Sequence, residues 1–498
     1  MTRRDSAIDT ALGRLPAEPE QPGGTVLPRL VVAAPGSGHG KTTVATGLMA
    51  ALRERGLEVT GFKVGPDFID PGYHSLATGR PGRNLDPFLC GAASVAPLLV
   101  HGASADGPTD VAVLEGVMGL FDGRIGSDGF ASTAHVATLT RTPVVIALDV
   151  SHMTRTAAAI VHGLATFEPG VRVAGVVLNK AASGRHVREV WSALDATGVP
   201  VLGVLPRDAG IEAPSRHLGL VPAAERDEAA RSVELLAERV AEHVDLDQVL
   251  AIARSAPELD APAWDAVAAL GDAARPDLPT DSQPVVAVAG GRAFTFRYTE
   301  TDELLRAAGL EPVVFDPLTA PSLPRGTAGL YLGGGFPEVH AEELSANGTL
   351  RGEVLRAVRA GLPTVAECAG MLYLCGAVDG AAMVGAIPAD AAMGPRLTLG
   401  YRSAIAPGDS VLAVAGRRVT GHEFHRTTVT PDPGASPAAW LLDGTPDGFA
   451  LDPAGTGRAT LHASYLHTHW AGHPQLAASF ADAVHAYAAA PGSRSKAS

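Results

Sequence analysis

The sequence predicts an α/β protein made of two different domains in series, each built on a mostly parallel sheet. Three observations support this prediction. Short apolar runs alternate with helix-like segments in both halves, a Gly-rich loop follows the first run, and a Pro- and Asp-rich stretch over residues 270–284 divides the halves. At 498 residues the chain is also too long for a single core.

The first half reads as a series of βαβ units. Helix-like segments separate its apolar runs, which indicates a mostly parallel sheet covered on both faces. A helix is expected over 223–244, where Val233, Leu236 and Val240 share one face. The expected strands are residues 29–34, 57–64, 111–116, 142–150, 171–180 and 199–206, and a second series follows at 284–290, 310–317, 327–335 and 362–368.

Composition limits the function and the compartment. The net charge of −14 argues against a nucleic-acid binder, which normally carries a basic face. Three cysteines are too few for a disulfide framework and suit a reducing cytosol. No apolar run suits a signal peptide or approaches the roughly 18 residues of a membrane span. We therefore expect a cytoplasmic protein without nucleic-acid or membrane partners; whether it forms a homodimer is left open.

The segment APGSGHGKTT, between the first strand and the first helix, has the character of a phosphate-binding loop. Its glycines let successive backbone N–H groups point at one anion. Lys41 can reach the terminal phosphates, and the Thr42 hydroxyl can bind Mg²⁺. Pro35 stands where the motif G-x-x-x-x-G-K-[ST] has its first Gly. The predicted ATP-binding residues of this loop are Gly36, Gly38, Gly40, Lys41, Thr42 and Thr43.

Polar side chains follow several of the other expected strands. Glu115 ends one strand, where a Walker-B-type acid would lie, and Asp122 comes seven residues later. Asp67 and Asp70 come just past another strand end. Because ligands gather at the carboxyl ends of parallel strands, these acids can converge on the phosphate loop. Asn179, at a further strand end, is placed to read the adenine edge.

The stretch PTVAECAGMLYL predicts a strand-to-helix turn that carries Cys368. Ala366 and Gly370 give the small-x-nucleophile-x-small spacing of a nucleophile elbow, where the turn is tight and strained. At a helix N-terminus the dipole would lower the pKa of the thiol. A buried, inert core cysteine is the alternative, and that is the expected role of Cys90 and Cys375.

A thiol nucleophile also needs a base and an oxyanion hole. The segment LHASYLHTHW offers His462, His467 and His469 as bases. The segment LYLGGGFPE places three glycines at a strand end, where backbone N–H groups can bind an oxyanion, with Gly334 and Gly335 as the predicted donors. Together these features predict a thiol amidase.

At these residues the chain resembles the cobyrinate/hydrogenobyrinate a,c-diamide synthase family of cobalamin biosynthesis. The likeness covers residues 29–485 and rests on the motifs APGSGHGKTT, FKVGPDFIDPGYHSLATGRPGRNLDPF, LEGVMGLFDG, LGGGFPE, ECAGMLYL, GHEFHRT and SYLHTHW. It implies a dethiobiotin-synthetase-like P-loop domain followed by a class-I-type glutamine amidotransferase domain. The expected division is an ATP-binding domain over 28–250, a linker over 251–283, an amidotransferase domain over 284–490, and disordered tails at 1–27 and 491–498.

The resemblance also implies residue roles. Cys368 becomes the glutaminase nucleophile and His467 its base. Thr468 and His469 follow this base, whereas a Glu commonly stands two residues after it, so the centre resembles a Cys–His dyad. Phe68 stands where some relatives have Tyr. The implied metal residues are Thr42, Asp67 and Glu115, and the residues nearest the substrate carboxylates are Asp70 and Asp122.

The family's activity would be the amidation of the a and c acetate carboxylates of a corrinoid, with ATP, Mg²⁺ and glutamine, through an acyl phosphate. The Ala/Arg-rich, Lys-poor composition suggests a GC-rich bacterial genome. The cobalt-free substrate is common in such bacteria, which favours hydrogenobyrinate. Three alternatives stay open. One is amidation of other side chains, as by cobyric acid synthase. Another is a regulatory partitioning-type ATPase, against which Gly36 counts because such proteins have a signature lysine there. The third is a catalytically inactive C-terminal scaffold.

Overall fold

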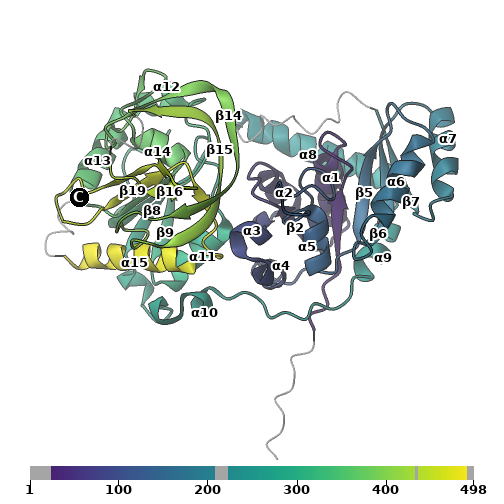
Figure 1. Ribbon diagram of the computed structural model, residues 1–498, viewed down its shortest axis with the longest axis horizontal. Coiled ribbons are helices and arrows are strands. Elements are labelled where there is room, and N and C mark those ends of the chain that lie inside the picture. Colours follow the sequence, from purple (N-terminus) through teal and green to yellow (C-terminus); the bar gives the residue numbers. More distant parts are fainter. Residues whose placement is uncertain (1–23, 208–222, 432–435, 491–498) are drawn as a thin grey trace, which may run out of the picture.

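The computed structural model describes residues 24–207, 223–431 and 436–490. Figure 1 shows two halves side by side, each with helices packed around a sheet, as the sequence predicts. Most of the two predicted tails, residues 1–23 and 491–498, lies outside the described residues. Within the described part of the chain, no helix is both long enough and apolar enough to cross a bilayer.

The first half contains a seven-stranded parallel sheet in the order β3-β2-β4-β1-β5-β6-β7. All six predicted runs form strands. The additional strand, β3, is only three residues long, too short to give a periodic signal. The strands are β1 (Arg29–Ala33), β2 (Val59–Val64), β3 (Arg83–Leu85), β4 (Val111–Glu115), β5 (Val144–Asp149), β6 (Val173–Ala181) and β7 (Val201–Pro206).

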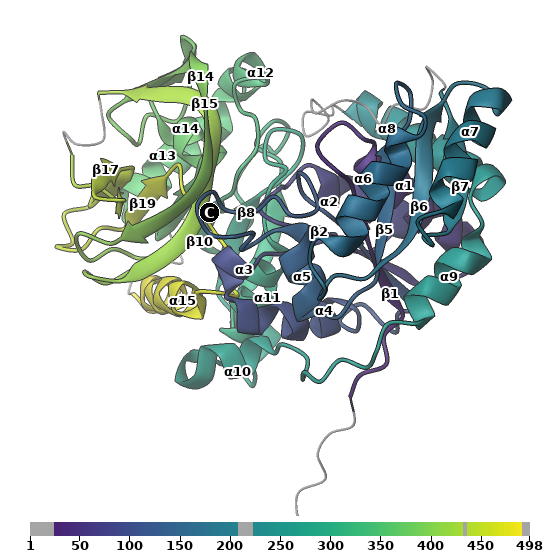
Figure 2. The ribbon, with the colours of Figure 1, turned by 45° about the vertical axis from the view of Figure 1, so that its right-hand side comes forward.

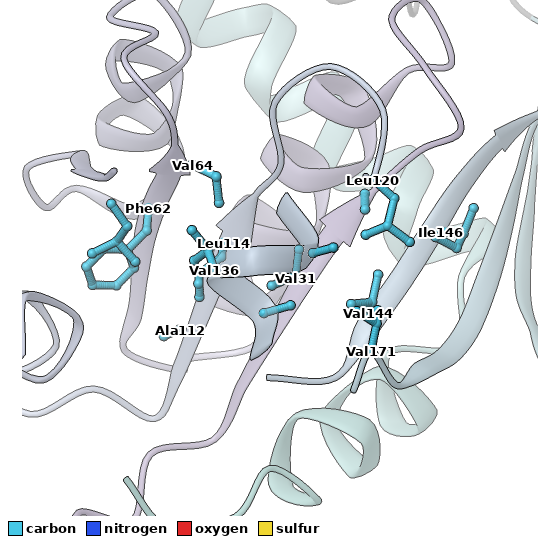
Figure 3. Packing of buried hydrophobic residues seen from close by; sticks show 14 of the residues in the cluster. Val31, Phe62, Val64, Ala112, Leu114, Leu120, Val136, Val144, Ile146 and Val171 are labelled. Carbon is cyan, nitrogen blue, oxygen red and sulfur yellow. The ribbon is translucent and has the colours of Figure 1, made fainter. Parts of the chain in front are cut away.

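Helices cover both faces of this sheet because its strands are apolar on both sides. Val31 faces one layer of helices and Leu30 the other, and both are fully buried. Figure 3 shows the first layer, where Val31 and Leu114 pack near Val136. The helices are α1 (Lys41–Glu54), α2 (Asp70–Thr78), α3 (Pro87–Cys90), α4 (Val95–Gly102), α5 (Thr133–Leu139), α6 (Thr156–Thr166), α7 (Gly184–Asp195), α8 (Ala223–His243, the predicted helix) and α9 (Leu246–Arg254).

The second half contains a six-stranded sheet in the order β18-β19-β11-β10-β8-β9, parallel except for β18. Its strands are β8 (Val285–Ala289), β9 (Glu311–Phe315), β10 (Thr327–Leu332), β11 (Thr364–Glu367), β18 (Phe449–Leu451) and β19 (Leu461–Ser464). Its helices are α10 (Ala266–Leu270), α11 (Thr299–Ala307), α12 (Ala341–Ala346), α13 (Gly348–Arg359), α14 (Ala369–Leu374) and α15 (Pro474–Ala489).

A further, mainly antiparallel sheet was not predicted. Its two long strands, β14 (Asp390–Ile405) and β15 (Arg418–Thr430), expose many polar residues and therefore give no continuous apolar run. β15 pairs with the two-residue strand β20 (His467–Thr468), which places His422 opposite His467. The remaining strands are β12 (Ala377–Val378), β13 (Ala381–Ala382), β16 (Trp440–Leu442) and β17 (Thr445–Asp447).

The segments predicted as a tail and a linker are partly structured. Thr25 forms an antiparallel bridge with Leu259, and Leu27 is buried in the first half, so residues 24–27 do not belong to a disordered tail. The expected linker begins inside α9, whose Ala253 is buried in the first half. Leu270, at the end of α10, is buried in the second half. These short segments lack apolar periodicity of their own, so their structure could not be predicted from a local pattern.

The two halves meet along β3 and α3, and both views place α3 between them (Figures 1 and 2). Arg83 of β3 is buried and forms ion pairs with Glu300 (2.8 Å) and Glu303 (2.7 Å) of α11. Asp86, which caps α3, accepts a hydrogen bond from the hydroxyl of Tyr401 in β14 (2.7 Å). Buried polar contacts of this kind fix the orientation of one half against the other.

Leu114→Ala should destabilise the first half, because Leu114 is fully buried at the centre of the sheet and its truncation leaves a cavity. The expected loss in free energy of unfolding is about 2–5 kcal/mol, measured by urea denaturation. The matched control is Leu235→Ala in α8, where the side chain is 49% exposed. An equal loss in both variants would contradict the assigned packing.

Candidate active site

The phosphate loop adopts a conformation that requires glycine at two positions. Gly38 and Gly40 have φ values of 84° and 89°, in the left-handed region. A Cβ on Gly40 would lie 2.0 Å from the side-chain nitrogen of Asn179. The loop ends where α1 begins at Lys41, whose ammonium donates to the carbonyls of Gly36 (3.2 Å) and Met118 (2.5 Å). Thr42 and Thr43 follow in the first turn of α1.

A buried ionic cluster lies beside this loop. The Thr42 hydroxyl donates to Glu115 (2.6 Å) and lies 3.5 Å from an oxygen of Asp70. The Lys63 ammonium lies between the two carboxylates, 2.5 Å from Asp70 and 3.1 Å from Glu115. The other oxygen of Glu115 lies 2.7 Å from Nε2 of His74. Two segments that are distant in sequence, the end of β4 and the start of α2, therefore converge on Thr42, as expected for the carboxyl ends of parallel strands.

The charges in this cluster are strongly coupled. Burial alone would raise the pKa of Glu115, but the Lys63 ammonium and the hydrogen bond from His74 outweigh burial and hold it well below its ordinary value. Burial and repulsion by Glu115 raise the pKa of Asp70. Burial opposes the charge on Lys63, yet the adjacent carboxylates raise its pKa overall. The cluster therefore keeps Glu115 ionised and Lys63 charged, whereas Asp70 holds its proton more firmly than an ordinary aspartate.

The oxygen atoms of Thr42, Asp70 and Glu115 are the ligand type that Mg²⁺ prefers, and one or two carboxylates are usual when phosphates complete the shell. This donor set fits the predicted ion, but with Asp70 in the place predicted for Asp67. The carboxylate of Asp67 has a different contact. It accepts the backbone N–H groups of Ile69 (2.8 Å) and Asp70 (3.3 Å), so it stabilises the entry into α2.

Asn179 and Asp122 also lie close to the phosphate loop. The Asn179 amide donates to the carbonyl of His39 (3.1 Å), and its oxygen accepts the N–H of Lys180 (2.9 Å). Asn179 therefore supports the loop with one amide N–H and its oxygen, and the contact with an adenine edge stays a prediction. Asp122 accepts the N–H of Gly119 (3.0 Å) in the loop after β4.

Three residues of this region were not predicted from the sequence: Lys63, His74 and Lys180. Lys63 and His74 belong to the ionic cluster, and Lys180 lies 3.1 Å from Asp149 and donates to the carbonyl of Gly38 (3.3 Å). One signal was available for Lys63, because a lysine inside the apolar strand β2 must pair with carboxylates once it is buried. His74 gives no such signal, since a helical histidine is not unusual.

Cys368 stands at the predicted nucleophile elbow. It lies between β11 and α14 with φ 47° and ψ −100°, a conformation that side-chain-bearing residues rarely adopt. Its N–H donates to the carbonyl of Ser464 in β19 (2.7 Å). A Cβ on Gly370 would lie 2.3 Å from the carbonyl oxygen of Leu332, so α14 packs tightly on β10.

The expected lowering of the Cys368 pKa is wrong for this conformation. The side chain is only 5% exposed, and burial and the nearby Glu338 carboxylate raise the pKa of its thiol, while the N–H of Ala369 acts in the opposite direction. Helix α14 has only six residues, so its dipole is too small to outweigh burial. The thiol is therefore protonated at rest and needs a base.

His467 is the candidate base that lies beside the glycine loop. A Cβ on Gly334 would lie 2.5 Å from Cε1 of His467, so only glycine fits there. The N–H of Gly334 donates to the carbonyl of Phe296 (3.0 Å). This N–H is therefore not free to bind an oxyanion, which corrects the prediction for Gly334 and leaves Gly335, with φ 156°, as the predicted donor.

The other two candidate bases have structural contacts. His462 is buried against Ser410 (3.0 Å), and burial lowers its pKa to about 3. His469 stacks on Tyr298, with ring centroids 4.1 Å apart, and lies 3.6 Å from Glu300. Both histidines are therefore held by structural neighbours.

One loop connects the two candidate centres. Phe68 lies between Asp67 and the ionic cluster residue Asp70, and its ring reaches the second half. There it stacks on Phe296 with centroids 4.3 Å apart and lies 6.0 Å from the ring of His467. The phosphate-binding half thus contacts the thiol-bearing half directly beside the candidate base.

Comparisons with known proteins agree with this division. Residues 30–221 match the model of the CobQ/CobB/MinD/ParA nucleotide binding domain, and residues 285–475 match the CobB/CobQ-like glutamine amidotransferase domain. Hydrogenobyrinate a,c-diamide synthases of Thermobifida fusca and Streptomyces coelicolor are 64% and 52% identical to this chain, over 92% of it and 97% and 98% of their own lengths. Cobyrinate a,c-diamide synthase of Synechococcus is 41% identical, over 91% of this chain and 98% of its own length.

The fold and the site define a P-loop nucleotide-binding protein joined to a glutamine amidotransferase domain. The chain belongs to the hydrogenobyrinate/cobyrinate a,c-diamide synthase family, a family of glutamine-dependent amidating ligases. The family, the fold class and the enzyme class that the motifs predicted are therefore confirmed.

Lys63→Met should destabilise the protein, because it leaves the buried Asp70 and Glu115 carboxylates without their cation. The expected loss in free energy of unfolding is about 3–5 kcal/mol near neutral pH. Since Lys63 lowers the pKa of Glu115 below its unfolded value of about 4.3, this contribution is fully present above that pH and is lost as the pH falls through the folded value.

The measurement is urea denaturation at several pH values. Arg55→Met is the matched control, because its ion pair with Asp247 is exposed and worth less than about 1 kcal/mol. A loss for Lys63→Met no larger than that of the control would show that the cluster does not depend on Lys63.

Proposed function

We propose that this protein amidates the a and c acetate carboxylates of hydrogenobyrinate, using ATP, Mg²⁺ and glutamine. The closer relatives bear the name of the cobalt-free corrinoid, at 64% and 52% identity, whereas the relative named for cobyrinate is 41% identical. This supports hydrogenobyrinate over the cobalt-containing substrate.

The observation that carries the proposal is the contact of Phe68 with the ring of His467. A carboxylate is a poor electrophile, and ammonia is mostly protonated at neutral pH, so one site must activate the acid and a neighbouring site must release ammonia. Phe68 belongs to the loop that leads into the acidic cluster and touches the thiol-bearing half. Ammonia would therefore have only a short distance to travel.

In the first half, the phosphate loop would hold ATP and transfer its terminal phosphoryl group to the substrate carboxylate, giving an acyl phosphate. Gly36, Gly38 and Gly40 would present N–H groups to the phosphates, and Lys41 would leave its present carbonyl partners to neutralise the transferring group. Thr42, Asp70 and Glu115 would hold Mg²⁺, whose charge supports phosphoryl transfer. Asp67 would keep the α2 entry in place, and Asp122 would lie near the substrate carboxylates.

In the second half, the Cys368 thiol would lose its proton to His467 and attack the side-chain amide of glutamine. The resulting tetrahedral oxyanion would be held by the N–H of Gly335. The proton then passes to the amide nitrogen, which leaves as ammonia, and water cleaves the Cys368 thioester to release glutamate. The ammonia attacks the acyl phosphate, which forms the amide and releases phosphate.

Cys368→Ser should lower glutamine-dependent amidation by more than about 10³-fold and keep activity with added ammonium salt. Lys41→Ala should lower the reaction from either nitrogen source by at least about 10²-fold, because it removes charge stabilisation from phosphoryl transfer. Both corrinoids are offered with ATP and Mg²⁺, and the product masses are followed. Cys375→Ala, which removes a second buried cysteine at the end of α14, is the control and should retain glutamine-dependent activity.

Two outcomes of this experiment would refute the assignment. The first is loss of the ammonium-driven reaction in a folded Cys368→Ser variant, which would mean that the thiol serves the amidation site itself. The second is full amidation by Lys41→Ala.

Phe68→Ala should loosen the contact between the two centres and allow ammonia to escape. The expected result is that more than one glutamate is formed per amide, whereas the parent forms them in equal amounts. Phe68→Tyr keeps the ring and is the matched control, expected to stay near one-to-one. Equal stoichiometry in Phe68→Ala would mean that the contact seen with Phe296 and His467 has no part in retaining ammonia.

A further inference from the structure

The thiol centre lacks the acid that commonly stands two residues after the base, yet a carboxylate from another strand faces that base. We propose that Glu367 is a positioning residue that orients His467 and stabilises its protonated form. The centre would then be a Cys–His–Glu arrangement whose acid precedes the nucleophile in sequence. The inference rests on the proposed glutaminase function of Cys368 and revises the dyad expected from the sequence.

Distance and burial single out Glu367. Its Oε2 lies 3.8 Å from Nδ1 of His467, and the side chains are 7% and 0% exposed. Among the described residues, neither ring nitrogen of His467 has a hydrogen-bond partner. A buried imidazole without a partner is unfavourable, and hydrogen bonds of catalytic groups often tighten only when substrate binds. A movement of less than 1 Å would close this gap.

The Glu367 carboxylate is itself held in place. The hydroxyl of Tyr331 in β10 donates to Oε2 (3.2 Å), and the hydroxyl of Thr468 in β20 donates to Oε1 (3.0 Å). Trp470 in turn donates its indole N–H to the Thr468 hydroxyl (3.2 Å). The acid is thus fixed by donors from both neighbouring elements, as orientation of a base requires.

The usual acid position does not perform this role here. His469 occupies it, and its ring stacks on Tyr298 and lies 3.6 Å from Glu300, which pairs with Arg83 of the first half. This position therefore belongs to the contact between the halves. Glu367 is the last residue of β11, so the same strand end supplies the nucleophile and the acid.

In the proposed reaction, one proton moves from the Cys368 thiol through His467 to the leaving nitrogen of glutamine. Nε2 of His467 accepts the thiol proton of Cys368, and the resulting imidazolium donates a hydrogen bond from Nδ1–H to the Glu367 carboxylate. The Nε2 proton passes to the leaving nitrogen of glutamine, so ammonia departs as the thioester forms. A carboxylate at Nδ1 fixes the tautomer that exposes Nε2 as a base, as in the serine-protease triad.

The other groups around His467 do not supply this charge. His422 of β15 stacks on its ring with centroids 4.9 Å apart, and burial followed by repulsion from His467 lowers the pKa of His422, so it is neutral. Burial also lowers the pKa of His469 on the adjacent turn. Phe68 and Phe296 present uncharged rings. Within the described residues, Glu367 is the carboxylate paired with His467.

The test is Glu367→Gln, which keeps the shape and removes the charge. Glutamine hydrolysis should fall by about 10²-fold in kcat with little change in KM. Ammonium-driven amidation should match the parent, which shows that the variant is folded. Because a carboxylate partner raises the pKa of an imidazole, the acid limb of the kcat/KM profile should move to lower pH in the variant.

Asp447→Asn is the matched control. Asp447 is a buried carboxylate of β17 that bonds the Ser464 hydroxyl and not His467. It should leave the acid limb unchanged and kcat within a few-fold of the parent. Thr468→Val removes one hydrogen-bond donor to Glu367 and should give an intermediate fall in kcat. This variant tests the positioning role if Glu367→Gln does not fold.

Parent-like kcat and an unmoved acid limb in Glu367→Gln would overturn the positioning role while leaving the proposed function intact. Parent-like glutamine hydrolysis in Cys368→Ser would instead overturn the proposed function, and this inference with it. A fall in kcat of equal size for Asp447→Asn would also overturn the inference, since any buried carboxylate would then serve.

Discussion

The pairing of the Lys63 ammonium with Asp70 and Glu115 is the interaction on which the rest of the synthetase centre depends. Two ionised carboxylates are strongly unfavourable side by side in a buried site unless a cation lies between them. The pairing fixes the carboxyl ends of β2 and β4 against the start of α1, and it thereby sets the position of the phosphate loop. A divalent ion would meet carboxylates that are already assembled and desolvated.

The loop between β2 and α2 links this centre to the other half. Asp67 caps the entry into α2, and the fixed turn directs Phe68 onto Phe296 and towards His467. The interface along β3 and α3, with Arg83 buried between two glutamates, holds the halves in the orientation that makes this contact. The two candidate centres thus share one short segment, which is a physical reason for keeping both on a single chain.

The thiol centre combines strain with burial. Cys368 is held at a positive φ because β11 and α14 fix both sides of the turn, and burial keeps its thiol protonated at rest. Under the proposed function, the reactivity of the thiol depends on the base, His467, and on the residue that orients it, Glu367. Glu367 and His467 come from different strands, so their geometry exists only when β11 and β20 are both in place.

The sequence by itself determined the parallel strands, the phosphate loop, the cysteine elbow and the family, because each is encoded by a local pattern of glycine, apolar and reactive residues. It could not give the β14–β15 hairpin, whose exposed face has no continuous apolar run, or the ordered residues 24–27. Only the tertiary structure decided that the N–H of Gly334 donates to the carbonyl of Phe296 and that Asn179 supports the phosphate loop. It also decided that Lys63 pairs with Asp70 and that Glu367 lies beside His467. Those outcomes depend on which distant strand ends are packed together and on what is buried there, and no local pattern records either.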